Sequence, residues 1–201
     1  MSVQLCLALL ALSSLTAASD PGCDELTKPL EDRSKVYGKW IFQVLASDSE
    51  EMLKAVKISN SSWMAIQSPV PGSSDYNIRF ADRIDGKCEH GTANSTTSGN
   101  SMKVTFYFNS TTYGHVGKFL ETCPDCILWM DDEVTEGNGE PKKCKSLYLF
   151  TKTGKLDASQ MEVFKKQAEC LNITLDFYFP DTTDLCPEEK EAAEDVKTEE
   201  Q

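Results

Sequence analysis

The chain has 201 residues, of which 26% are charged, and its formal net charge at pH 7 is −12. This length suits one domain of ordinary size. The strongly acidic balance argues against nucleic acid as a partner, because contacts with phosphates require lysine and arginine.

Residues 1–19 have the features of a secretory signal peptide. They carry no charged side chain, and the apolar run over 5–12 is followed by small residues. The run is too short to span a bilayer, and Ala17 and Ser19 fit a small-x-small cleavage site. Cleavage leaves roughly 182 residues, enough for a hydrophobic core. We therefore expect a protein secreted into plasma or another extracellular fluid, with no membrane insertion.

Two covalent features accompany this expectation of secretion. Four Asn-x-Ser/Thr sequons mark candidate glycosylation sites at Asn60, Asn94, Asn109 and Asn172. Loss of Cys6 with the signal peptide leaves an odd number of cysteines, so at most three disulfides form. One thiol stays free or pairs with another molecule. We expect a monomer, with a dimer through the unpaired cysteine as the alternative.

From Gly38 onward, short alternating runs of apolar and polar residues are separated by turn residues, which is typical of an all-β sandwich or barrel. In the first run, Trp40, Phe42 and Val44 share one face of a strand. Asp85-Gly86 is a signal for a two-residue hairpin. Eight strands with tight turns favour an antiparallel up-and-down barrel, which leaves no exposed edge. We place these strands at 38–46, 55–67, 75–84, 87–94, 101–109, 113–121, 126–133 and 146–152.

One helix and a short ninth strand follow the barrel strands. Asp157 is a good N-cap with Gln160 three residues later, and an apolar stripe at helical spacing runs from Met161 to Leu171. We expect this helix to pack against the outside of the barrel. Residues 175–179 predict the ninth strand. The folded domain then spans 20–187, and the acidic tail over 188–201 is predicted to be disordered.

The order of these features resembles the lipocalins over the whole mature chain, beginning with Gly38-Lys39-Trp40 at the first strand. The opening Cys-Asp-Glu-Leu-Thr-Lys-Pro-Leu from Cys23 is similar to fish plasma glycoproteins that bind saxitoxin, tetrodotoxin or tributyltin. The end, Leu-Cys-Pro-Glu-Glu-Lys around Cys186, is similar to orosomucoid (alpha-1-acid glycoprotein). The sequence departs from the wider family in lacking the Thr-Asp-Tyr motif and the arginine that packs on the tryptophan, for which Lys152 is the nearest cation.

The resemblance implies two disulfides, Cys23 with Cys170 and Cys88 with Cys186. For the remaining cysteines we expect a local disulfide from Cys123 or Cys126 to Cys144, and we take Cys126 with Cys144. A redox Cys-x-x-Cys would need a helix N-terminus to lower the thiol pKa, but a strand is predicted after Cys126.

A zinc site that uses these cysteines would need a histidine, and neither His90 nor His115 has zinc-finger spacing. We therefore expect no metal and no cofactor.

The interior of an eight-stranded barrel is just wide enough for side chains or one small ligand. A glycan on Asn109 must point outward, so alternation turns every second residue up to Phe108 inward, and all of these are apolar. The same rule applied to Asn60 points Trp63 inward, although a bulge is then needed because Met64 would face the other way. The resulting ligand-pocket candidates are Phe42, Trp63, Tyr76, Phe80, Phe106 and Phe108; the alternative is that they fill a closed core.

The functional expectation is a secreted lipocalin that binds and carries a small apolar or amphipathic molecule, including a toxin or xenobiotic such as tetrodotoxin, saxitoxin or tributyltin. A cationic toxin would need a carboxylate near the cavity. The available carboxylates near strand ends are Asp75, Asp82, Glu89, Glu121 and Asp131. No catalytic motif is present and only two histidines exist, so we expect no enzyme and no catalytic residue. The alternative is an acute-phase or immunomodulatory glycoprotein that acts through its surface and glycans, with a vestigial pocket.

Overall fold

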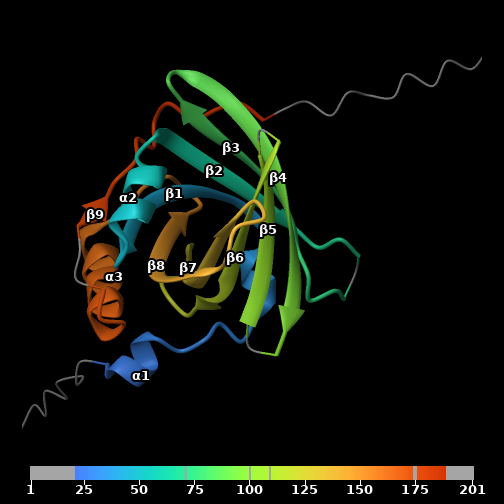
Figure 1. Cartoon of the computed structure of the whole chain (residues 1–201). Helices are drawn as coiled ribbons and strands as arrows, with labels where there is room; N and C mark the ends of the chain where they lie inside the picture. Colours follow the sequence, from blue (N-terminus) through green and yellow to red (C-terminus); the bar gives the residue numbers. More distant parts are fainter. Residues whose placement is uncertain (1–20, 71, 100, 109, 174–175, 189–201) are drawn as a thin grey trace, which may run out of the picture.

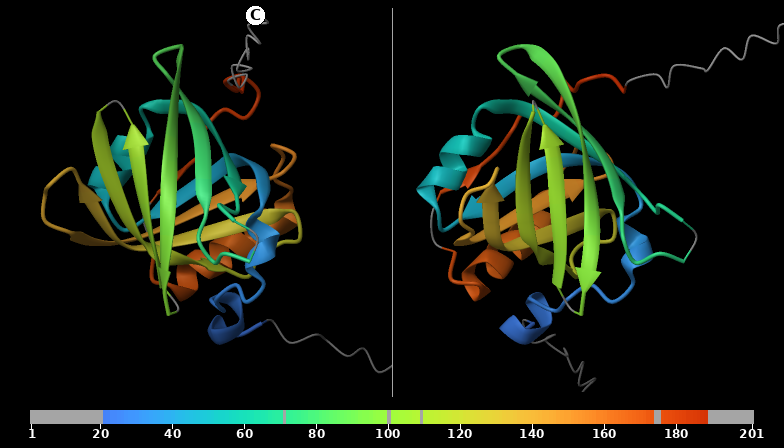
Figure 2. Two further views of the ribbon diagram at one scale, coloured as in Figure 1. Left: turned by 90° about the vertical axis from the view of Figure 1, so that its right-hand side faces the viewer. Right: turned by 45° about the vertical axis from the view of Figure 1, so that its right-hand side comes forward.

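The computed structural model describes residues 21–188 except 71, 100, 109 and 174–175. The predicted signal peptide, the Asn109 sequon and nearly all of the acidic tail lie outside the described residues. Within them, one antiparallel sheet closes into a barrel, with its strands in the order β2-β3-β4-β5-β6-β7-β8-β1 and β2 paired back to β1 (Figures 1 and 2). The predicted eight-stranded up-and-down barrel is confirmed. Its strands are β1 (Gly38–Ser47), β2 (Ser59–Gln67), β3 (Asn77–Ile84), β4 (Lys87–Ser98), β5 (Ser101–Phe108), β6 (Thr111–Leu120), β7 (Cys126–Glu136) and β8 (Lys142–Thr151).

The first strand begins with a glycine because the chain turns into the sheet there with a left-handed backbone. Gly38 has a φ of 114°, which L side chains rarely adopt. Two residues later Trp40 is only 1% exposed, and its Nε1–H donates to the carbonyl oxygen of Val36 at 2.7 Å. Lys152 Nζ lies 5.2 Å from the centroid of the Trp40 ring, close enough for a cation–π contact. The tryptophan therefore fills one end of the barrel.

The N-terminal segment covers this filled end. It contains α1 (Cys23–Leu26) and the 3-10 helix η1 (Arg33–Val36), neither of which was predicted. Pro29 forms an isolated bridge to Leu120 at the end of β6. At the opposite end of the barrel, the connections β1–β2, β3–β4, β5–β6 and β7–β8 surround the mouth.

The predicted helix is present as α3 (Ala158–Cys170) and lies outside the barrel (Figure 1). Asp157 and Gln160 form the expected capping box, which satisfies helix N–H groups that have no intrahelical partner. Phe164 and Ala168 pack with apolar residues of β7 and β8. The short strand β9 (Phe177–Tyr178) pairs with β1. No helix in the described part of the chain is long and apolar enough to cross a membrane.

A second helix, which was not predicted, precedes β2 and overlaps the first two residues of the strand predicted at 55–67. Helix α2 (Glu50–Val56) begins at Ser49, whose hydroxyl accepts a hydrogen bond from the Met52 amide. Two glutamates in its first turn interact favourably with the helix dipole. The strand was predicted to begin too early because Ala55, Val56 and Ile58 extend the alternating pattern toward the N-terminus, although the first two belong to the helix.

Candidate ligand-binding site

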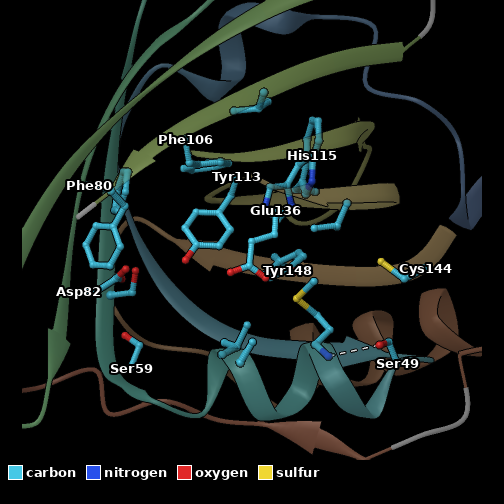
Figure 3. A pocket seen from close by; sticks show the side chains of 18 of the residues that line it. Ser49, Ser59, Phe80, Asp82, Phe106, Tyr113, His115, Glu136, Cys144 and Tyr148 are labelled. Carbon is cyan, nitrogen blue, oxygen red and sulfur yellow. Dashed lines mark hydrogen bonds between the residues drawn. The ribbon is translucent and has the colours of Figure 1, made fainter. Parts of the chain in front are cut away.

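The barrel encloses a cavity of about 720 Å³ that opens at the end where α2 lies (Figure 3). Small-molecule sites usually have volumes of about 300–1,000 Å³. The floor and walls are mainly apolar and include Met64, Ile78, Val104, Phe119 and Trp129. Met52 and Val56 of α2 extend this apolar lining to the mouth. The barrel is therefore hollow, and the alternative of a closed aromatic core does not hold.

Four of the six aromatic residues proposed from the sequence lie in this wall: Phe42, Phe80, Phe106 and Phe108. Phe80 contacts Phe106 edge to face, with ring centroids 5.5 Å apart. Phe42 packs on Phe150, whose ring centroid is 5.3 Å away. These rings offer a broad apolar surface to a ligand. Their role in binding stays a prediction.

One side of the cavity is polar. Asp82 of β3 lies beside Ser59 and Ser62 of β2, and all three line the cavity. Burial raises the pKa of Asp82, while hydrogen bonds from the two serine hydroxyls oppose this shift. Across the cavity, Tyr113 and Glu136 also direct polar atoms into the space (Figure 3). A ligand with one polar end can thus be oriented within an otherwise apolar chamber.

A buried carboxylate on β7, Asp131, lies against lining residues of the cavity. Asp131 has no exposed surface and accepts a hydrogen bond from the indole Nε1–H of Trp129. His115 Nδ1 lies 2.8 Å from Asp131 Oδ2, and because a carboxylate only accepts, this nitrogen carries the proton. Burial, with a further contribution from Asp131, raises the pKa of the Tyr148 hydroxyl well above its ordinary value. The network fixes the orientation of three side chains that line the cavity.

Solved structures of other proteins share this architecture. The bovine lipocalin allergen Bos d 2 matches with a TM-score of 0.57 and 17% identity, over 78% of this chain and 99% of that chain. The chain has the lipocalin fold. The siderocalin Ex-FABP, described as having dual ligand specificities, matches with a TM-score of 0.55 and 17% identity over 78% of this chain and 96% of its own. Siderocalin Q83, described as having a dual ligand binding mode, matches with a TM-score of 0.55 and 17% identity over 79% of this chain and 96% of its own. No protein-family model and no curated protein matches the sequence.

The prediction that Trp63 faces the interior of this lipocalin barrel was wrong. A bulge between Ser59 and Ser61 shifts the alternation, so that Met64 faces the cavity and Trp63 faces outward. The indole is nevertheless buried, because the C-terminal segment covers it and the carbonyl oxygen of Cys186 accepts a hydrogen bond from its Nε1–H at 2.7 Å. Strict alternation counted from Asn60 does not hold across this bulge.

Tyr76 also lies away from the cavity, in the filled end of the lipocalin barrel. It precedes β3, and its ring packs edge to face on Tyr37 and Phe119. Its hydroxyl donates to the carbonyl oxygen of Arg33 at 3.3 Å, and burial raises the pKa of this phenol to about 12. Tyr76 is therefore part of the core that closes the barrel rather than of the ligand wall.

Sequence reasoning missed His115, Tyr113 and Glu136 as cavity residues. Alternation along β6 could have identified Tyr113 and His115, because they lie on the same face of the strand as Phe119 and all three line the cavity. Of the five carboxylates proposed for a cationic ligand, Asp82 lines the cavity, and Asp131 is fully buried against the lining residues His115 and Trp129. The other three, Asp75, Glu89 and Glu121, are not among the lining residues.

The cysteines pair in part as the resemblance implied. Disulfides join Cys23 to Cys170 and Cys88 to Cys186. The expected pair of Cys126 with Cys144 was wrong, because Cys126 bonds to Cys123 and Cys144 is free. In the β7–β8 ladder Cys126 lies opposite Thr151, at the far end of β8 from Cys144. At about 3.4 Å per residue, the seven residues from Cys144 to Thr151 separate the two cysteines by roughly 24 Å, whereas a disulfide needs Cα atoms within about 7 Å.

The free thiol of Cys144 lines the cavity and is buried. Burial, aided by the Asp131 carboxylate, raises its pKa to about 11. Both the burial and the raised pKa disfavour reaction of this thiol, and the dimer through an unpaired cysteine stays a prediction. Within the described residues, no group of three His, Cys, Asp or Glu side chains is arranged to hold a metal ion.

The described sequon asparagines are exposed. Asn60, Asn94 and Asn172 all lie on the surface, where a glycan can be accommodated. Their glycosylation stays a prediction.

Proposed function

We propose that this protein is a secreted member of the lipocalin family that binds and carries a small apolar or amphipathic molecule in its barrel. The observation that carries the proposal is the open cavity of about 720 Å³ with an aromatic wall and one polar side. Burial of apolar ligand surface contributes roughly 25 cal/mol per Å². The polar side then sets the orientation of the ligand. The disulfides and the signal-like N-terminus support secretion, and the absence of a catalytic motif favours binding over catalysis.

Within this proposal, the first ligands to test are tributyltin, saxitoxin and tetrodotoxin. The motifs at the two ends of the chain resemble fish plasma glycoproteins that bind these molecules, as well as orosomucoid. The two kinds of ligand would use different parts of the cavity. The butyl chains of an organotin would pack on the phenylalanine wall, whereas a guanidinium toxin would need the carboxylates of Asp82 and Glu136.

A fluorescence titration tests the proposal. Trp129 lines the cavity, so an environment-sensitive apolar fluorophore bound inside should receive energy from it. We expect saturable binding at one site that an unlabelled apolar competitor reverses. Unchanged emission at fluorophore concentrations well above micromolar would overturn the proposal.

The exposed sequons favour a second candidate, an acute-phase or immunomodulatory glycoprotein acting through its glycans. Enzymatic deglycosylation separates the two. If the cavity carries the function, deglycosylation should leave the affinity for the ligand nearly unchanged. If the glycans carry the function, deglycosylation should abolish the immunomodulatory activity.

A further inference from the structure

The chain after α3 forms a strap over the outside of the barrel. This C-terminal strap, residues 177–188, begins with β9 on β1 and continues across β2 and β3 (Figure 1). Its far end is fixed by the disulfide from Cys186 to Cys88 of β4. Trp63 is buried beneath this end together with Ala81 and Cys186. Arg83 adds two contacts with Asp184, donating from Nε to its carbonyl oxygen at 2.9 Å and pairing with its carboxylate at 3.0 Å.

The strap bonds to each of the three consecutive residues that form the β2 bulge. The Tyr178 hydroxyl donates to the carbonyl oxygen of Ser59. The backbone N–H of Asp181 donates to the carbonyl oxygen of Asn60 at 2.7 Å. The hydroxyl of Ser61 donates to the carbonyl oxygen of Asp184 at 2.6 Å. A bulge interrupts the regular ladder and leaves backbone groups unpaired. Here the strap donates to two backbone groups of the bulge, the carbonyl oxygens of Ser59 and Asn60.

The inner side of the same bulge forms the polar side of the cavity. The interrupted alternation turns both Ser59 and Ser62 toward Asp82, and all three line the cavity. Ser62 lies opposite Asp82 in the β2–β3 ladder, and the Ser59 hydroxyl donates to the carbonyl oxygen of Ser61 within the bulge at 3.1 Å. A regular strand would alternate sides and could not direct residues of opposite parity at one carboxyl group. The geometry of this polar side therefore depends on the bulge, and the bulge is held by the strap.

We propose that the C-terminal strap is a positioning element of the binding site. By holding the β2 bulge, it orients Ser59 and Ser62 toward Asp82 and so sets the preference for ligands that carry a polar, hydrogen-bonding end over wholly apolar ligands. Tyr178 and Ser61 are positioning residues that act from outside the barrel. This inference rests on the proposed binding function and assigns a determinant of its selectivity.

The test compares two probes that share one aromatic body. Dansylcadaverine ends in an amine, and dansyl pentylamide has the same chain without it. Tyr178→Phe removes the hydroxyl that bonds to Ser59, and Cys88→Ser with Cys186→Ser frees the strap. Tyr107→Phe, at an exposed site on β5, is the matched control for the first variant. Cys23→Ser with Cys170→Ser, which frees α1 from α3, is the control for the second.

We expect both strap variants to lower the affinity ratio of the amine probe to the apolar probe by roughly threefold to tenfold, and both controls to leave it unchanged. Hydrogen exchange of the amides over 59–62, measured without ligand, should be faster in the strap variants only. Unchanged ratios, unchanged exchange, or equal effects in the controls would overturn the inference. If the unmodified protein binds neither probe, the proposed function fails, and the exchange measurement alone decides whether the strap holds the bulge.

Discussion

Phe80 keeps its place in the cavity wall because the residue beside it on β4 has no side chain. A Cβ atom added at Gly91 would lie 2.3 Å from Phe80 Cζ and 2.7 Å from Cε1, where ordinary contacts begin at 3.4 Å. In Gly91→Ala the tip of the ring must therefore move by roughly 1 Å, and the open cavity is the space available to it. The backbone of Gly91 is not left-handed, so alanine itself causes no strain there.

Two other strand glycines provide graded comparisons for Gly91→Ala. At Gly114 a Cβ would meet Thr135 Cβ at 3.6 Å, which is an ordinary contact. At Gly117 it would lie 2.0 Å from the carbonyl oxygen of Met130, which is backbone and cannot rotate away. We expect Gly114→Ala to be neutral, Gly91→Ala to cost about 1 kcal/mol of stability, and Gly117→Ala to cost about 3 kcal/mol or more.

Thermal unfolding and probe titration together give the assay. Gly91→Ala should remain folded yet bind an apolar fluorophore about tenfold more weakly than Gly114→Ala, because the displaced ring occupies ligand space. Equal affinity in these two variants would refute the placement of Phe80 against Gly91 in the cavity wall.

Three further predictions concern the disulfides, Asp82 and the free thiol. Removing the Cys88–Cys186 disulfide, which joins residues 98 apart, should lower the free energy of unfolding by about 4–5 kcal/mol. Removing the local Cys123–Cys126 disulfide should lower it by only about 2 kcal/mol, because the closed loop is short. Equal losses in denaturant unfolding would show that the loop-entropy account is wrong. Burial raises the pKa of Asp82 above 3.8, so the folded state binds the carboxyl proton more tightly than the unfolded state, and the free energy of unfolding contributed by this group falls as the pH rises through the folded-state pKa. Asp82→Asn should therefore lose less stability between pH 4 and pH 7 than the unmodified protein. An unchanged difference between the two pH values would contradict the raised pKa. Cys144, whose pKa is raised to about 11, should react with a disulfide reagent at pH 8 far more slowly in the native protein than after unfolding, and rapid native labelling would show that it is accessible.

The barrel could be predicted because its signals are local. Alternation, the Asp85-Gly86 hairpin and the turn residues each act over a few positions, and the capping residues of α3 lie three residues apart. The inward row on β5 was likewise set by simple alternation. The register of the β7–β8 hairpin is also local information, and it would have excluded a bond between Cys126 and Cys144.

The remaining differences depend on distant parts of the chain. Trp63 faces outward because a bulge is supported by hydrogen bonds to residues 178–184, more than a hundred positions away. Tyr76 closes the barrel because its hydroxyl meets Arg33 of the N-terminal segment. Periodicity within one strand contains neither contact. The helix α2 was missed for a different reason: it is only seven residues long, and its last two residues, Ala55 and Val56, were counted with the strand that follows.

The most direct test of the central claim is to fill the cavity with a side chain. Val104 lies in the cavity wall, while Val70 is 60% exposed in the loop after β2. Val104→Trp and Val70→Trp are therefore matched substitutions that differ in location. If the barrel carries the ligand, Val104→Trp should abolish saturable binding of an apolar fluorophore while Val70→Trp binds as the unmodified protein does. Equal binding by the two variants, both shown to be folded by circular dichroism, would contradict the account.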